Sequence, residues 1–186
     1  LGFRGPAPTD SDRSALELLL ALLTGPEGRL RPVLLGRGLA FKIEPQVVEG
    51  AEPGYVALTL ATSPDRAEAA EAALRDELRR LCDRPVPEDE LSRARQHLLG
   101  LYERGLERRL GLAEALALHE AHGLGHAAAL RYGERLQAVD SAALQRAAKH
   151  LFEDRPAVLA AVPTNGHAAL DADTILCTVA AAGSWR

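Results

Sequence analysis

Four polar residues at 119–126 have the side chains best suited to binding a metal ion: His119, Glu120, His122 and His126. Neutral imidazole is a common zinc ligand, and a neighbouring carboxylate can serve as a ligand or a general base. The zinc-hydrolase patterns His-Glu-x-x-His and His-x-x-Glu-His both need two histidines four residues apart on one helix. His119 and His122 are three apart, and a Gly-Leu-Gly sequence interrupts the helix between His122 and His126. We therefore expect these histidines at the surface and helix ends, with no metal site.

Other motifs that could carry chemistry are incomplete. Asp171 and Asp173 form a carboxylate pair, but the glycine and distal glutamate of a calcium loop are missing. A Ser–His–Asp catalytic triad, assembled by folding, is an open alternative, although no Gly-x-Ser-x-Gly sequence marks a nucleophile. The glycines between Gly25 and Gly38 match neither a phosphate-binding loop nor a dinucleotide-binding fingerprint. We expect them where a helix turns into a strand, because glycine tolerates unusual backbone conformations.

The composition is that of an ordinary globular protein, with 186 residues, 47% hydrophobic and 26% charged. We predict one domain at 1–163, followed by a tail at 164–186. A formal net charge of −4 gives no reason to expect a nucleic acid or a membrane as partner, and no apolar run reaches the roughly 20 residues of a membrane helix. Cys82 and Cys177 have no metal-binding spacing, and we expect two buried thiols, with a single disulfide as the alternative.

The chain contains no methionine and begins inside an expected strand. We therefore expect a fragment of a longer, bacterial protein, from which any targeting signal is missing. The compartment in which the protein works cannot be read from this sequence.

Apolar residues at helical spacing predict a series of helices, and breaks at glycine and proline separate them. The expected helices lie at 11–24, at 64–81, from 88 onwards, at 112–122, at 126–136 and at 141–152. The helix at 11–24 is apolar on nearly every side, so we expect it at the centre of the core. Arginines on the helix from 88 indicate either an interaction face or, as we favour, a solvated surface paired with Glu103 and Glu107.

Alternating apolar residues predict an antiparallel hairpin of two strands, at 38–44 and 55–62. In the first strand, Leu39, Phe41 and Ile43 are expected to face the core, and Pro45 indicates an edge or a bulge. Further strands are expected at 1–4, at 155–162 and at 174–179. The predicted fold is α+β, with a mostly antiparallel sheet and helices layered on one face.

The segment at 25–43 carries a family resemblance. It contains Gly28-Arg29-Leu30, a short apolar run, and then Gly38-Leu39-Ala40-Phe41. This order resembles the carboxy-terminal half-domains of the pitrilysin/insulinase-type zinc metallopeptidases, which include the mitochondrial processing peptidases. The resemblance extends from Leu1 to the apolar stretch that ends near Val162.

The resemblance implies a non-catalytic domain. In that family zinc is held by a His-x-x-Glu-His helix of the other, homologous half, and the carboxy-terminal half supplies an arginine and a tyrosine to the bound peptide. Here the arginine position falls near Leu35 and the tyrosine position is Phe41, which cannot donate a hydroxyl proton. No catalytic residue is expected, and Arg29, Arg37 and Phe41 are the candidate substrate-binding residues. For Phe41 we favour core packing beside Leu39 and Ile43.

The expected function is therefore to form the chamber wall and contact the peptide substrate, opposite a zinc-bearing half on the same chain or on a partner. This chain is expected to hold no cofactor and to be inactive alone. The alternative is a purely structural, catalytically dead homologue that acts in subunit assembly.

Overall fold

The computed structural model describes residues 1–7, 9–48 and 54–152. In chain order the elements are β1 (Gly2–Arg4), α1 (Arg13–Thr24), the π-helical turn η1 (Arg31–Leu35), β2 (Lys42–Val48), β3 (Tyr55–Ala61), the 3-10 turn η2 (Pro64–Arg66), α2 (Ala67–Asp83), α3 (Glu88–Leu106), α4 (Arg109–Ala121), the 3-10 helix η3 (His126–Arg131), α5 (Tyr132–Gln137) and α6 (Ser141–Phe152). The predicted strands at 155–162 and 174–179, the domain boundary at 163, Asp171, Asp173 and Cys177 lie outside these residues.

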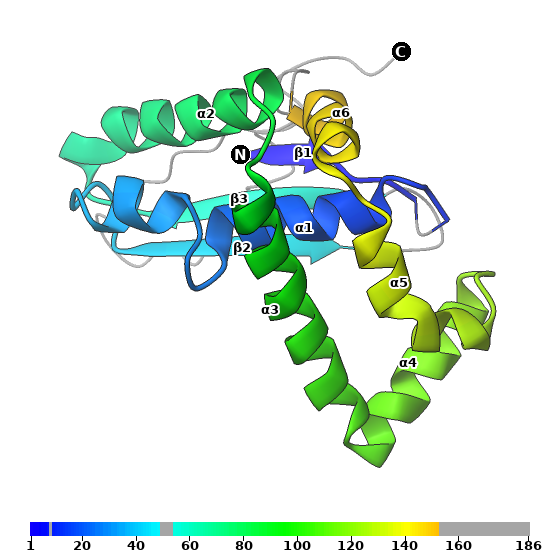
Figure 1. Cartoon of the computed structure of the whole chain (residues 1–186). Coiled ribbons are helices and arrows are strands. Elements are labelled where there is room, and N and C mark those ends of the chain that lie inside the picture. Colours follow the sequence, from blue (N-terminus) through cyan, green and yellow to red (C-terminus); the bar gives the residue numbers. More distant parts are fainter. Residues whose placement is uncertain (8, 49–53, 153–186) are drawn as a thin grey trace, which may run out of the picture.

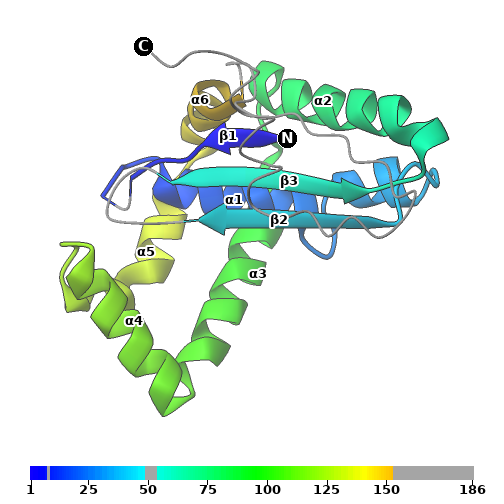
Figure 2. The same cartoon turned by 180° about the vertical axis from the view of Figure 1, so that it is seen from behind.

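The described strands form one antiparallel sheet in the order β1-β3-β2. The predicted hairpin is confirmed: β2 pairs with β3 from Lys42 opposite Ala61 to Val48 opposite Tyr55. α1 lies across one face of this sheet with α2 and α6 beside it (Figure 1), and the sheet stands in front of these helices when seen from behind (Figure 2). The α+β fold with helices on one face is therefore as predicted.

The helix α1 forms the centre of the core. Seven of its twelve residues are buried, including Leu18, Leu19 and Leu23, which have no exposed surface. It contacts α3, α5, α6 and β2. Leucines on nearly every side of a helix require such neighbours, because each face must be removed from water. None of the described helices is long and apolar enough to cross a membrane.

The start of β2 differs from the prediction. The strand begins at Lys42 instead of Gly38, and Ala40 is buried while Phe41 is 71% exposed. Gly38 has φ +65°, a left-handed conformation that favours glycine, and the chain turns at 36–40 before β2 begins. Leu39 and Ile43 pack against the core as predicted, but the turn places Phe41 outside it. The prediction that Phe41 packs in the core is therefore wrong.

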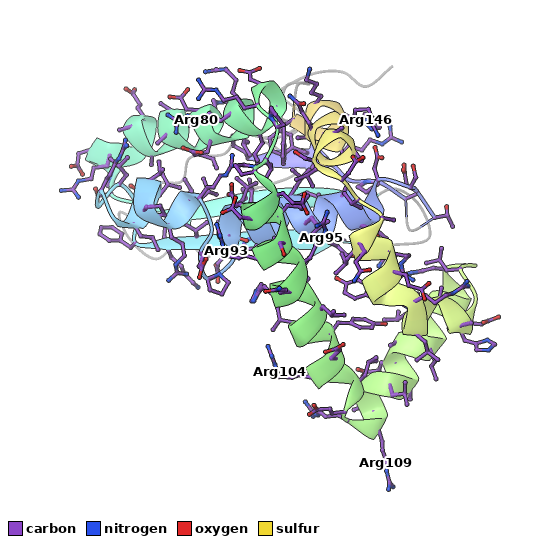
Figure 3. All side chains as sticks on the ribbon, in the orientation of Figure 1. Arg80, Arg93, Arg95, Arg104, Arg109 and Arg146 are labelled. Carbon is purple, nitrogen blue, oxygen red and sulfur yellow. The ribbon has the colours of Figure 1, made fainter. Side chains whose placement is uncertain are left out.

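The predicted pairing of the arginines on α3 with Glu103 and Glu107 is also wrong. Arg93 instead pairs with Asp89 and with Glu27, and Arg95 pairs with Glu88, at the end of α3 nearest the body. At the other end, Arg109 points away from the helices (Figure 3), and a terminal nitrogen of Arg104 lies 3.4 Å from the position of a Cβ atom on Gly100. Among the described residues, no ion pair joins either of these two arginines to a carboxylate.

The helices α3 and α4 form a V that extends away from the body (Figures 1 and 2). The corner is close-packed, since a Cβ atom on Gly111 would lie 2.2 Å from the carbonyl oxygen of Gly105. No Cβ has that separation from an oxygen, so a larger residue at 111 must open the corner.

Replacing Gly111 by alanine is expected to lower the free energy of unfolding by about 2 kcal/mol, because the new methyl group forces the backbone apart. Gly105→Ala is the matched control. Nothing lies within 4 Å of a Cβ at that position, and alanine is the better helix former, so a gain of about 0.5–1 kcal/mol is expected. Urea unfolding of both variants gives the two values, and equal effects would contradict the packing of this corner.

Candidate functional site

The turn between η1 and β2, residues 36–41, carries two of the three predicted substrate-binding residues. Its backbone is hydrogen-bonded to η1: the carbonyl oxygen of Leu34 accepts from the amides of Leu39 at 2.8 Å and Ala40 at 3.1 Å. Leu34 and Ala40 are buried beneath the turn, which anchors it to the core.

Side chains from the opposite strand and helix hold the same turn from outside. The guanidinium of Arg66 donates to the carbonyl oxygen of Gly38 at 2.6 Å, and the hydroxyl of Thr62 donates to that of Leu39 at 2.6 Å. The amide of Phe41 donates to the carbonyl oxygen of Ala61 at 2.7 Å, where β2 starts. The turn is therefore fixed at both ends, although it lies at the surface.

The two side chains of interest project from this fixed backbone into solvent. Phe41 is an exposed aromatic ring, and Arg37 is exposed and makes no hydrogen bond or ion pair with any described residue. An aromatic ring and a cation on a fixed turn can contact a peptide at little entropic cost, because they need not be ordered first. We call Arg37 and Phe41 the turn site.

The edge strand β2 continues directly from the turn site. Among the described strands it pairs with β3 alone, so no described strand lies along its other side. Pro45 lies in the middle of β2, which agrees with the predicted edge position, because proline lacks the amide that a central strand needs.

Arg29, the third predicted substrate-binding residue, lies elsewhere. Its guanidinium donates through Nε and a terminal nitrogen to the two oxygens of Glu90, both at 2.6 Å. Both side chains are only about one-fifth exposed, and the hydrogen bond to Glu90 raises the pKa of Arg29. This bidentate pair fastens the segment after α1 to α3, so the guanidinium is committed to the fold.

A groove of about 600 Å³, which we call the α1/α3 groove, lies between α1, the segment at 25–31 and α3. On α1 it is lined by Glu17, Leu20 and Ala21, which have the same i, i+3, i+4 spacing as the ligands and base of a His-x-x-Glu-His helix. Only the first of these three can bind a metal. Arg31 and His97 add charge and hydrogen-bonding capacity from the facing segments. The sequence analysis did not predict this groove. The spacing of Glu17, Leu20 and Ala21, which places them on one side of a helix, was the only signal for it.

The carboxylate of Glu17 is already engaged. The hydroxyl of Tyr132 on α5 donates to it at 2.5 Å, and the Tyr132 ring stacks on Tyr102 of α3 with centroids 4.2 Å apart. Burial, and then the nearby negative charge of Glu17, raise the pKa of Tyr132 well above its usual value. The three residues tie α1, α3 and α5 together.

This contact makes stability depend on pH in the alkaline range. An unfolded tyrosine loses its proton near pH 10, whereas folded Tyr132 retains it, so stability falls as pH rises above about 10, by up to about 1.4 kcal/mol per pH unit. Tyr132→Phe removes this titrating group, so the free energy of unfolding is expected to decrease less between pH 10 and 11. At pH 7 the same variant should cost about 1 kcal/mol, for the lost hydrogen bond. Urea unfolding at pH 7 to 11 measures both effects, and parallel pH profiles for the two proteins would contradict the contact.

The histidines at 119–126 do not come together as a metal site. The Arg135 guanidinium can only donate, so His119 Nε2, at 3.2 Å from it, must accept. The proton of His119 therefore lies on Nδ1, which donates to the carbonyl oxygen of Ala115 at 2.8 Å. His126 lies against Glu120, and His122 caps the end of α4.

No group of three metal-binding side chains occurs within 1–7, 9–48 and 54–152. The residues described there do not fit a zinc ion. Cys82 is buried, as predicted, with its Sγ 3.4 Å from the carbonyl oxygen of Ala148.

Comparison with known proteins identifies the family. The family model described as the peptidase M16 inactive domain matches residues 1–98. The fold is similar to the inactive peptidase domain of a candidate zinc protease from Bordetella parapertussis, with 24% identity, a TM-score of 0.71, and 81% of each chain covered. No curated protein matched this chain.

Two further solved structures are longer than this chain. A protease from Helicobacter pylori has 20% identity and a TM-score of 0.73, with 81% of this chain and 37% of that chain covered. The peptidase M16 inactive domain from Pseudomonas fluorescens has 18% identity and a TM-score of 0.71, with 81% and 36% covered.

The α+β fold and these matches define a non-catalytic domain of the zinc-protease type. The chain belongs to the peptidase M16 family and corresponds to its inactive domain. The resemblance read from the segment at 25–43 is thereby confirmed.

Proposed function

We propose that this chain forms one wall of a peptidase chamber and binds the peptide substrate, while a homologous half carries the zinc ion and the catalytic residues. The observation that supports this most directly is the turn site: a backbone held at both ends presents an exposed ring and an unpaired cation.

The chemistry of the turn site suits an extended peptide. Arg37 can bind a backbone carbonyl or an acidic side chain, and Phe41 can pack against an apolar side chain. The ring has no hydroxyl, so it contributes to binding and cannot stabilise a tetrahedral intermediate. Arg29, held by Glu90, keeps the preceding segment in place and takes no part in this contact.

The test is to mix the chain with a zinc-bearing homologous half and follow cleavage of an unstructured fluorogenic peptide. Arg37→Ala and Phe41→Ala are each expected to raise KM about 5- to 20-fold with kcat changed little, because they remove contacts made equally in the ground and transition states. Both side chains are exposed, so the melting temperature should stay within about 1 °C of the wild type.

Arg79→Ala is the matched control, since Arg79 is an exposed arginine on α2 that pairs only with Asp76 among the described residues. Its KM should equal that of the wild type. If the chain stimulates cleavage but the turn-site variants behave like the control, substrate contact lies elsewhere. If cleavage does not depend on the chain at all, the chain acts only in subunit assembly.

A further inference from the structure

The helix α4 exposes an apolar face that has the pattern of a buried one. Positions 110, 113, 114, 117, 118 and 121 are all exposed, and they follow the i, i+3, i+4, i+7, i+8 spacing that normally faces a core. Five of the six are apolar: Leu110, Ala113, Ala117, Leu118 and Ala121. The two leucines are 63% and 55% exposed, and no residue of α4 is buried. We call these five residues the α4 outer face.

The charges of α4 run against its own dipole. Arg108 and Arg109 stand at its amino-terminal end, where the first turn has no acidic residue, and Glu120 lies in its last turn. A helix dipole favours the reverse arrangement. Arg109 projects from the tip of the V into solvent (Figure 3) and has no ionic partner among the described residues. Such an arrangement becomes favourable when a second helix with the same charges lies antiparallel, because each basic end then meets an acidic end.

Glu120 is held in place for such a contact. One of its carboxylate oxygens accepts from the amide of His126 at 2.7 Å, and the other oxygen makes no hydrogen bond with a described residue. The backbone hydrogen bond from His126 lowers the pKa of Glu120, so that this carboxylate stays charged.

We propose that the α4 outer face binds a second copy of this chain, through antiparallel packing of α4 against α4 about a two-fold axis. The sizes of the side chains are self-complementary in one register. With Leu110 opposite Ala121 of the copy, Leu118 lies opposite Ala113, and the two-fold symmetry repeats both pairs. Each large side chain therefore meets a small one, as close helix packing requires.

The same register predicts which residue opposes association. Glu114 stands in the middle of the face, opposite Ala117 of the copy and about one turn from the other Glu114. Two carboxylates at that separation repel each other. The face is also small, because a 13-residue helix is about 20 Å long, and stable interfaces bury roughly 800 Å² on each partner. We therefore expect a weak dimer, with a Kd on the order of 100 µM.

The test is sedimentation equilibrium of the full chain between about 5 and 500 µM. Leu118→Glu is expected to weaken dimerisation at least 10-fold, and Arg109→Glu about 3- to 10-fold. Glu114→Gln, which removes the repulsion at unchanged size, should strengthen it about 2- to 5-fold. Leu130→Glu is the matched control: Leu130 is 68% exposed on η3, outside the α4 outer face, and its replacement should leave the Kd within about two-fold.

Three results would overturn the proposal. The first is a wild type that remains monomeric at 500 µM. If Leu118→Glu then weakens binding of a zinc-bearing half, the α4 outer face binds that partner instead. The second is a Leu130→Glu variant that dissociates as readily as Leu118→Glu, which would indicate non-specific association of exposed leucines. The third is a Glu114→Gln variant that dimerises less well than the wild type, which would exclude this register.

Discussion

Replacing Leu19 by alanine is expected to lower the free energy of unfolding by about 3 kcal/mol. Leu19 has no exposed surface and lies at the centre of α1, the helix that contacts the sheet, α3, α5 and α6. Truncation removes buried methyl groups and leaves a cavity that the surrounding helices can fill only in part. For a domain of this size, such a loss lowers the melting temperature by about 6–12 °C.

The measurement is urea or thermal unfolding followed by circular dichroism. Leu130→Ala is the matched control, because the same atoms are removed from a side chain that is mostly in water, and a change below about 0.5 kcal/mol is expected. Equal losses for the two variants would mean that α1 is not the central helix of the core.

Replacing Glu90 by glutamine is expected to lower the free energy of unfolding by about 2 kcal/mol. The change keeps the size of the side chain but leaves the four-fifths buried guanidinium of Arg29 without its anionic partner. An unpaired charge in a partly buried site is more costly than the loss of an exposed ion pair. The loss should appear in the midpoint of urea unfolding, with an unchanged dependence on urea concentration.

An exposed ion pair gives the control for Glu90. Lys42 and Glu44 are 2.5 Å apart, but both are more than half exposed, so Glu44→Gln should change stability by less than about 0.5 kcal/mol. A double-mutant cycle with Arg29→Met and Glu90→Leu measures the interaction free energy between the two side chains. The double variant should be less destabilised than the two single changes added together, and strict additivity would show that the two charges are not coupled.

Local pattern was sufficient for most of the fold. The helix at 11–24 could be predicted to lie at the centre of the core. It has leucines on nearly every side, so no side of it can face solvent without exposing apolar surface. The antiparallel hairpin followed from two alternating segments, and Pro45 marked its edge through the missing amide. Asp140, which accepts from the amide of Ala143 at 2.6 Å, could be recognised as the cap of α6 from its residue type and position.

The candidate site was only partly predictable. The order of glycines, Arg29 and Phe41 indicated the right segment and the right family, because glycine and aromatic positions at a helix-to-strand junction are a local signal. The exposure of Phe41 was not predictable, since it depends on whether the strand begins at 38 or at 42. A hydrogen-bonded turn at 36–40 interrupts the alternation, so that Phe41 is exposed while Ile43 packs against the core. The groups that hold this turn, Arg66 and Thr62, lie more than 20 residues away.

The sequence by itself thus determined the class of fold, the central helix and the lack of a His-x-x-Glu-His motif, because each depends on residue type at short spacing. Tertiary structure alone decided that Arg29 is bound to Glu90, that Phe41 and Arg37 face solvent, and that one face of α4 is left uncovered. These outcomes depend on contacts between segments 23 to 61 residues apart, or on the absence of such contacts among the described residues. Periodicity describes which side of a helix is apolar, and only the packed chain shows whether anything lies against it.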